Sequence, residues 1–222
     1  MESNNPVPKI KFSNGNEIPQ LGFGVYQIKG DEETERCVSE ALKVGYRHID
    51  TAHYYENERG VGAAIKKSGI PREQIFVTSK IWVTEYGSGK TTDALEKMLK
   101  RLDLEYLDLI LLHYPFNDYL GAYKELEEAY EKGLVKNIGI SNFEDEKFDE
   151  LYNAAKIKPV VNQIELHPYY QQKEIRKKMD AVNCRTEGWA PLGQSVTTIF
   201  NEETIKNIAQ KYNKTPAQVV LR

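Results

Sequence analysis

The sequence has few cysteines and no long apolar run, and each shortage excludes a class of protein. Only Cys37 and Cys184 occur among the 222 residues, which argues against a disulfide framework or a zinc cluster and favours a reducing cytosol. The longest apolar stretches, such as Leu109–Leu112, have the length of a strand and are far too short to span a membrane. The polar start, Met1–Lys11, has the pattern of neither a signal peptide nor a transit peptide.

The chain also lacks a strong excess of charge of either sign. Lys plus Arg number 30 against 33 for Asp plus Glu, a net charge of -3, so nothing in the charge balance indicates nucleic acid or an anionic membrane as a partner. Hydrophobic residues make up 40% and charged residues 28%, as in ordinary globular proteins. Because no low-complexity linker interrupts the chain, residues 1–222 are predicted to form a single domain.

What the sequence does contain is one repeated pattern, in which a short strand-like run is followed by an amphipathic helix. Apolar residues three and four apart predict helices over 95–102 and 205–212, and Gly45, Gly69 and Gly133 mark helix ends. Strands are predicted at Gln20–Tyr26, Tyr46–Asp50, Ile75 or Phe76 to Lys80, Tyr106–His113, Val135–Ser141, Val160–Glu165 and Arg185–Trp189.

Strands that alternate with helices predict parallel strands joined by helical crossovers. A doubly wound open sheet and a closed barrel both satisfy this pattern. The first strand is not followed by a Gly-x-Gly-x-x-Gly fingerprint, and polar residues end strand after strand, as a barrel needs for a site at its C-terminal face. We therefore predict a (β/α)8 TIM barrel, preceded by a β-hairpin that turns at Asn14-Gly15.

Several polar side chains at the predicted strand ends could converge at the mouth of such a barrel. Asp50 and Lys80 form a natural pair, because a desolvated lysine needs a counter-charge. Beside Lys80, the pKa of Tyr55 would fall and its phenol could give a proton to an oxyanion, while His113 could orient a carbonyl oxygen. Each residue alone also has a structural interpretation: an ion pair, a packed ring and a histidine bonded to backbone.

A set of motifs extends this pattern along the chain. They are Asp50-Thr-Ala-x-x-Tyr55-x-Asn-Glu58, Thr78-Ser79-Lys80-Ile-Trp82, Leu-Leu-His113-Tyr-Pro115, Gly139-Ile-Ser141-Asn142-Phe143 and Asn162-Gln163-Ile-Glu-Leu-His167-Pro168. In order and spacing they resemble the signatures of the aldo-keto reductase family, and the short segment 115–123 is similar to that of microbial reductases of the 2,5-diketogluconate reductase type. The resemblance implies a monomeric, cytoplasmic, NADP-dependent oxidoreductase that reduces a small aldehyde or ketone without a metal.

The same resemblance implies a role for each site residue. Tyr55 is the general acid, Lys80 lowers its pKa, and Asp50 holds Lys80. His113 orients the substrate carbonyl, while Glu165 and His167 are interpreted as structural. The implied cofactor-binding residues are Gly24, Val25, Asp50, Ser141, Asn142, Gln163, Trp189, Ala190 and Leu192, and the implied substrate-binding residues are Tyr26, Tyr54, Trp82, His113 and Tyr114.

Two other functions fit parts of the sequence. Lys80 could form a Schiff base in an aldolase-type barrel, or the barrel could bind a nucleotide without catalysis. One feature also departs from the family. The eighth strand, the last helix and the motif that contacts the 2′-phosphate would follow the predicted helix at 216–221, whereas the sequence ends at Arg222. We therefore expect an incomplete barrel with unpaired edge strands, the front part of a longer polypeptide that is not a competent enzyme by itself.

Overall fold

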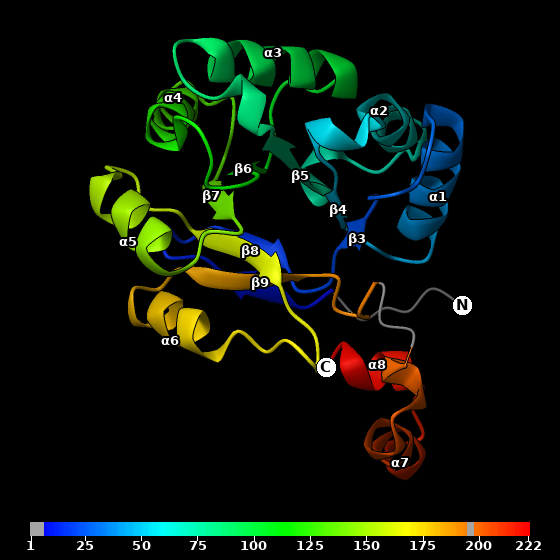
Figure 1. Ribbon diagram of the computed structural model, residues 1–222. Helices are drawn as coiled ribbons and strands as arrows, with labels where there is room; N and C mark the ends of the chain where they lie inside the picture. The colour runs from blue at the N-terminus through cyan, green and yellow to red at the C-terminus, as the bar shows by residue number, and fades with distance from the viewer. Residues whose placement is uncertain (1–6, 195–197) are drawn as a thin grey trace.

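The fold is built on one curled parallel sheet and a small hairpin (Figure 1). The computed structural model describes residues 7–194 and 198–222. The hairpin pairs β1 (Lys9–Lys11) with β2 (Glu17–Pro19) in antiparallel fashion. The seven-stranded sheet has the order β3-β4-β5-β6-β7-β8-β9. Its strands are β3 (Phe23–Gly24), β4 (His48–Asp50), β5 (Phe76–Ile81), β6 (Leu109–Leu112), β7 (Ile138–Ser141), β8 (Val161–Glu165) and β9 (Arg185–Trp189).

Helices cover the outer face of this sheet. Figure 1 shows α1 to α6 following one another around the outside, with α7 and α8 lying together apart from that ring. The helices are α1 (Asp31–Lys43), α2 (Glu58–Lys67), α3 (Lys90–Leu102), α4 (Tyr119–Glu131), α5 (Asp145–Ala154), α6 (Lys173–Ala181), α7 (Glu203–Tyr212) and α8 (Pro216–Val220), with short 3-10 turns η1 (His53–Tyr55), η2 (Arg72–Gln74), η3 (Val83–Glu85) and η4 (Ile199–Asn201).

The predicted (β/α) architecture is confirmed, and the strand order follows the chain as right-handed crossovers require. Within the described residues β3 and β9 are the two edge strands, so the sheet is curled and open. The predicted bounds fit β9 best, whereas the predicted strand Gln20–Tyr26 shortens to Phe23–Gly24. The shortening has a physical reason: Val25 still donates its N–H to Asp50 O at 3.0 Å, but the chain then turns, with Ile28 N–H donating to Val25 O at 3.2 Å.

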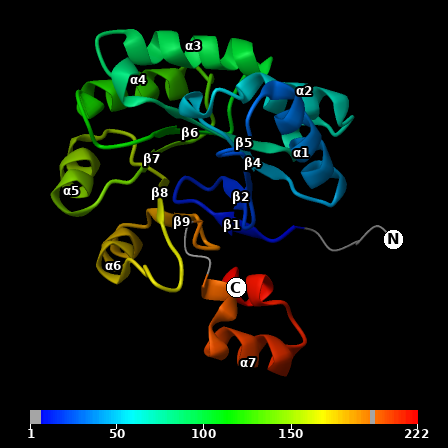
Figure 2. The same cartoon turned by 45° about the vertical axis from the view of Figure 1, so that its right-hand side comes forward.

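The hairpin covers the end of the sheet where the strands begin (Figure 2). Phe12, just after β1, packs against Phe76 at the start of β5, with ring centroids 6.4 Å apart. Leu109 of β6 belongs to the same buried cluster. From the last strand, Arg185 donates to Lys11 O at 2.9 Å. The hairpin therefore closes the end of the sheet where the strands begin. The opposite end, where the strands finish, stays open and is called the mouth below.

The sheet interior and the helix ends follow the sequence closely. Strands β5, β6 and β7 are buried at every residue, as expected for parallel strands covered on both faces. Gly45, Gly69 and Gly133 adopt φ values of +105°, +67° and +75° just after helices, a conformation that glycine reaches without a Cβ clash. Thr215 caps α8, with Pro216 at the first position of the helix. In the part of the chain described, no helix combines the length and the apolarity needed to cross a membrane.

Candidate active site

The buried pair expected from the sequence forms at the mouth of the sheet. Lys80, near the end of β5, donates to Asp50 Oδ1 at 2.6 Å and to Thr51 O at 3.0 Å. Its Nζ also lies 3.4 Å from the hydroxyl of Tyr55, which is the last residue of η1. The Lys80 side chain is 1% exposed, and that of Asp50 is 14% exposed. These three side chains therefore form one hydrogen-bonded group; Asp50 and Lys80 are called the buried pair below.

Lys80 is protonated and positively charged near neutral pH. Burial disfavours its ammonium form, but the negative charge of Asp50 and the hydrogen bond to its carboxylate outweigh that effect and raise the pKa of Lys80 above its usual value. A Schiff-base lysine must instead be available as a neutral amine. The electrostatics of the site thus favour a structural and electrostatic role for Lys80 over the aldolase-type alternative.

Tyr55 is a neutral phenol in this site. Burial raises its pKa, and although Lys80 lowers it, Asp50 cancels part of that effect, so the pKa ends above the usual value. The net lowering expected from the sequence is therefore not found; only the direction of the Lys80 contribution is as expected. The neighbouring cation alone predicts a lower pKa for Tyr55, but the cost of burying a phenolate is larger than that effect. A phenol that keeps its proton beside an ammonium is a suitable acid for an oxyanion that forms next to it.

His113 follows β6 and faces the same group. Its backbone N–H donates to Ile81 O at 3.2 Å, and its ring stands edge-on to that of Tyr55, with centroids 5.9 Å apart. Burial, helped by the charge of Lys80, lowers the pKa of His113 to about 3, so the imidazole is neutral near pH 7. Its Nδ1 is buried and has no hydrogen-bond partner among the described residues. A neutral imidazole can donate from one nitrogen to a carbonyl oxygen, as expected.

Three residues expected to hold a nicotinamide lie together beside this group. Asn142 follows β7 at φ +62° and donates through Nδ2 to His113 O at 2.9 Å and to Ser141 Oγ at 3.1 Å. Trp189, at the end of β9, donates through Nε1 to Asn142 Oδ1 at 2.8 Å. A half-buried indole held in this way offers a flat face beside amide groups, which fits a planar ring that carries a carboxamide.

Gln163 connects these positions to the buried pair. Its Nε2 donates to Asp50 Oδ2 and to Glu187 Oε1, both at 2.8 Å, so both of its amide hydrogens are used. Its backbone oxygen accepts from Ser141 Oγ at 2.9 Å. The side chains expected for catalysis and for cofactor binding therefore share one hydrogen-bond network.

The remaining expected cofactor positions lie at the two edge strands. Gly24 pairs with Asp50 across β3 and β4, and Val25 is fully buried, so its side chain belongs to the core. Ala190 follows β9 at φ +48°, and Leu192 is 37% exposed. Leu192 therefore exposes an apolar side chain, whereas Gly24, Val25 and Ala190 offer mainly backbone groups to a ligand.

Aromatic rings surround the buried pair on the solvent side. Tyr54 stacks on Trp82 with centroids 4.2 Å apart, Tyr26 packs against Tyr55 at 5.0 Å, and Tyr114 stacks on His113 at 5.2 Å. The structure thus brings together all the residues expected to bind substrate. A hollow of about 350 Å³ opens beside them, lined by Tyr114, Pro115, Phe116, Asn142, Glu144, Lys147, Glu165, Tyr170 and Trp189. Glu165, interpreted from the sequence as structural, is part of this lining.

Two interior residues were missed in the sequence. His48 and Glu187 lie close to Asp50, and one ligand-type atom of each falls within 4.8 Å of the others. Both carboxylates already accept N–H groups, and Lys80 places a positive charge beside them, so a cation would meet repulsion here. The period-2 pattern of β9, in which Arg185, Glu187 and Trp189 share a face, was the signal that could have identified Glu187.

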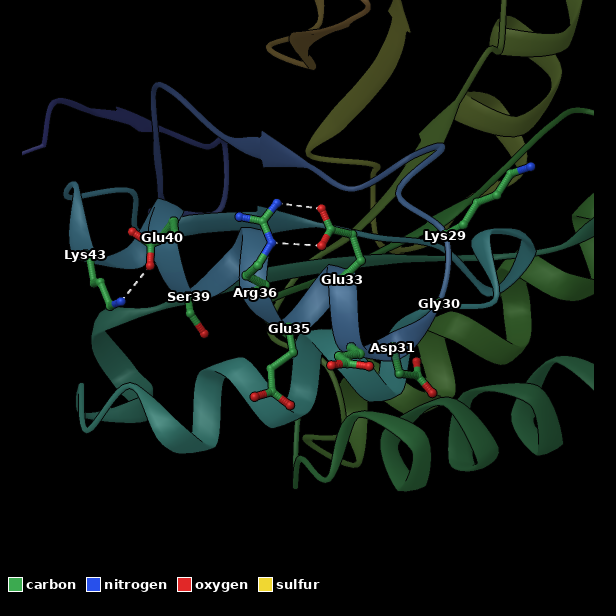
Figure 3. Close-up of a pocket in the computed structure, with 10 residues that line it drawn as sticks. Lys29, Gly30, Asp31, Glu33, Glu35, Arg36, Ser39, Glu40 and Lys43 are labelled. Atoms are coloured by element: carbon green, nitrogen blue, oxygen red, sulfur yellow. Dashed lines mark hydrogen bonds and ion pairs between the residues drawn. The ribbon is translucent and has the colours of Figure 1, made fainter.

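A second hollow lies on the outer surface along α1 (Figure 3). It is lined by charged side chains that pair with one another: Arg36 forms two bonds with Glu33, and Lys43 bonds Glu40 at 2.6 Å. None of the residues of the buried pair's network lines it. We therefore place the active site at the mouth and not on α1.

Comparison with known proteins agrees with this geometry. The sequence model of the aldo/keto reductase family matches residues 20–222. A glyoxal reductase from Bacillus subtilis is 44% identical over 214 residues, which cover 96% of this chain and 77% of that protein. A methylglyoxal reductase, DkgA, from Yersinia pestis is 44% identical over 218 residues, which cover 97% of this chain and 78% of that protein.

Solved structures of the same family share the fold. An aldo/keto reductase from Brucella melitensis superimposes with a TM-score of 0.93 at 44% identity, covering 98% of this chain and 84% of that one. An aldo-keto reductase from Bombyx mori, solved in complex with NADP, gives a TM-score of 0.91 at 30% identity, covering 96% of this chain and 78% of that one.

Proposed function

The chain belongs to the aldo/keto reductase family and is an oxidoreductase that reduces carbonyl groups, and from that premise we propose that it uses NADPH to reduce small α-oxoaldehydes to hydroxyaldehydes or hydroxyketones. The observation that carries the proposal is the contact of Lys80 Nζ with both Asp50 and the Tyr55 hydroxyl. The similarity of the chain to a glyoxal reductase and to a methylglyoxal reductase supports the choice of substrate.

Each residue of the site has a task in this reaction. The nicotinamide supplies the hydride when it is bound. Neutral His113 donates a hydrogen bond to the substrate oxygen and so fixes the carbonyl beside Tyr55. Tyr55 gives its phenolic proton to the oxygen as negative charge develops there, and the Lys80 ammonium stabilises the phenolate that remains. Asp50 holds Lys80 in place.

The cofactor residues are proposed on the same basis. Ser141, Asn142 and Gln163 would hold the carboxamide, and Trp189 would stack on the ring. Gly24, Val25, Ala190 and Leu192 would line the rest of the cleft, mostly through backbone. The preference for NADPH is supported by the Bombyx mori relative, which was solved with NADP. The aromatic rings of Tyr26, Tyr54, Trp82 and Tyr114 would line the substrate side.

The proposal also covers the setting of the enzyme. Cys37 and Cys184 are both free, which suits a reducing cytosol. We expect a monomer that acts on small molecules and not on nucleic acid.

The test follows the absorbance of NADPH as it is consumed with glyoxal, methylglyoxal and a panel of monocarbonyl aldehydes. We expect kcat/KM to be highest for the α-oxoaldehydes and higher with NADPH than with NADH. Borohydride treatment with substrate should leave Lys80 unmodified. A protein that binds NADPH but consumes none with any carbonyl compound would contradict the activity, and equal kcat/KM with the two cofactors would contradict the preference.

A further inference from the structure

Glu187 is a carboxyl inside the sheet that the proposed reaction does not use. It lies in the middle of β9, opposite Gln163 of β8 in the ladder. Its Oε1 accepts from Gln163 Nε2 at 2.8 Å, and the same nitrogen donates to Asp50 Oδ2 at 2.8 Å. Its Oε2 is buried without a hydrogen-bond partner in the part of the chain that the structure describes. One amide group therefore ties Glu187 to the buried pair.

The groups that face Glu187 set its charge. They are Asp50 and His48 from β4, Lys80 from β5 and the neutral amide of Gln163 from β8. Burial, and then the charge of Asp50, raise the pKa of Glu187 to about 7, against smaller opposing effects of Gln163 and Lys80. Burial lowers the pKa of His48 to about 4, so His48 adds no charge near neutrality. A single ammonium thus faces one carboxylate at acidic pH and two at alkaline pH.

We propose that Glu187 is a positioning residue: its charge, linked to the buried pair through Gln163, sets the pH range over which Tyr55 keeps its proton. When Glu187 is ionised, the added negative charge makes a phenolate less favourable and strengthens the hold on the Lys80 proton. The enzyme then remains a proton donor to higher pH. The inference rests on the proposed function, in which Tyr55 is the acid.

Glu187 also fixes the orientation of an amide expected to touch the cofactor. Because both hydrogens of Gln163 Nε2 bind carboxylates, its Oε1 is the atom left to meet a ligand. Loss of the Glu187 acceptor would free one of those hydrogens and let the amide turn. Charge and orientation can be separated by choosing substitutions that remove one and keep the other.

The test compares Glu187→Gln, which keeps shape and an acceptor oxygen but no charge, with Glu187→Asp, which keeps charge. Glu174→Gln, on the exposed face of α6, controls for the loss of a carboxylate elsewhere. For Glu187→Gln we expect the basic limb of kcat/KM for reduction to move down by a fraction of a pH unit, because Glu187 acts on Tyr55 through Lys80 and not by direct contact. The basic limb of Glu187→Asp should lie close to that of the parent protein. The basic limb of Glu174→Gln should coincide with that of the parent protein.

A second readout does not depend on activity. Carbon NMR of protein labelled at tyrosine Cζ, with Tyr55→Phe to assign the signal, gives the Tyr55 titration directly. We expect the same downward shift in Glu187→Gln. An unshifted Tyr55 titration in the folded variant overturns the inference. A shifted titration in a protein that reduces no carbonyl compound supports the inference and overturns the proposed function.

If Glu187→Gln does not fold, the parent protein still decides. Infrared difference spectra across neutral pH should show a protonated carboxyl band that disappears as pH rises. A parent protein in which the Tyr55 Cζ signal does not respond as that carboxyl ionises overturns the inference.

Discussion

The two ends of the proposed site are held in different ways. Lys80 lies in β5, a strand buried at every residue, and makes contacts with Asp50, Thr51 and Tyr55. Trp189 lies in β9, an edge strand whose residues are all half-buried or exposed, and its indole makes a single hydrogen bond, to Asn142. The residues proposed for proton transfer are thus held by burial and several hydrogen bonds, whereas the residue proposed to stack on the nicotinamide is held by one.

This difference indicates how each end should respond to substitution. Removing one member of a buried, charged group leaves an uncompensated partner, which is costly. Removing a half-exposed ring loses stacking area and little else. Stability and chemistry should therefore be coupled on the β4–β5 side and separable on the β9 side.

Tyr55→Phe should give the largest change in rate. The ring still packs on Tyr26, but the proton donor is gone, so kcat should fall by about 10²–10⁴-fold, as is typical when acid catalysis is lost. NADPH titration by fluorescence should show unchanged binding. A variant that reduces methylglyoxal at the parent rate would contradict the role of Tyr55.

Lys80→Met should give the largest change in stability. Asp50 would remain half-buried without its ammonium partner, at a cost of about 3–5 kcal/mol in the free energy of unfolding. Urea denaturation measures the loss. Lys67→Met, which removes an exposed ion pair with Glu35, is the matched control and should unfold as the parent does. Equal stability of the two variants would mean that the buried pair contributes little.

His48 should make the protein labile to acid. Its pKa is about 4 in the folded state against 6.5 for an ordinary histidine, because burial disfavours the imidazolium. Between these values the unfolded chain binds the extra proton, so stability is complete above pH 6.5 and falls as pH drops towards 4, by up to about 3 kcal/mol. Unfolding curves of the parent and His48→Gln across this window measure the effect. If the free energy of unfolding depends on pH in the same way in both proteins, a group other than His48 causes the acid lability.

Trp189→Leu tests the edge-strand side. Loss of the aromatic face should weaken NADPH binding by the equivalent of about 0.5–1.5 kcal/mol while the urea midpoint changes little. Trp82→Leu is the control on the substrate side and should raise KM for the carbonyl compound instead. If Trp189→Leu unfolds as easily as Lys80→Met, the contrast between the two ends is wrong.

Thr215→Ala should give the smallest effect. The substitution removes the hydroxyl that accepts from Gln218 N at 3.2 Å, which typically costs about 1 kcal/mol of helix stability. Because α8 contains no buried residue, hydrogen exchange within α8 should rise while global unfolding stays the same. A lower global urea midpoint would show that α8 is coupled to the sheet.

Local patterns in the sequence predicted most of the helices and strands. The polar residues at the ends of the predicted strands identified the candidate active site. The predicted strand Arg185–Trp189 is β9, and Gly69 ends α2 as predicted. The strand expected at Gln20–Tyr26 was too long, because an alternating pattern does not show where a ladder gives way to a turn. The residues that come together around Lys80 were named in advance because the ends of parallel strands meet at one edge.

The sequence by itself determined the order of strands and helices, the N-terminal hairpin and the identity of the side chains at the mouth, since these depend on local periodicity and turn chemistry. Only the tertiary structure decided the charges in the site. The pKa of Tyr55 rises because the fold buries its phenol. Glu187 joins the network because the fold brings Gln163 within hydrogen-bond reach of both Glu187 and Asp50, which lies 113 positions away in the chain.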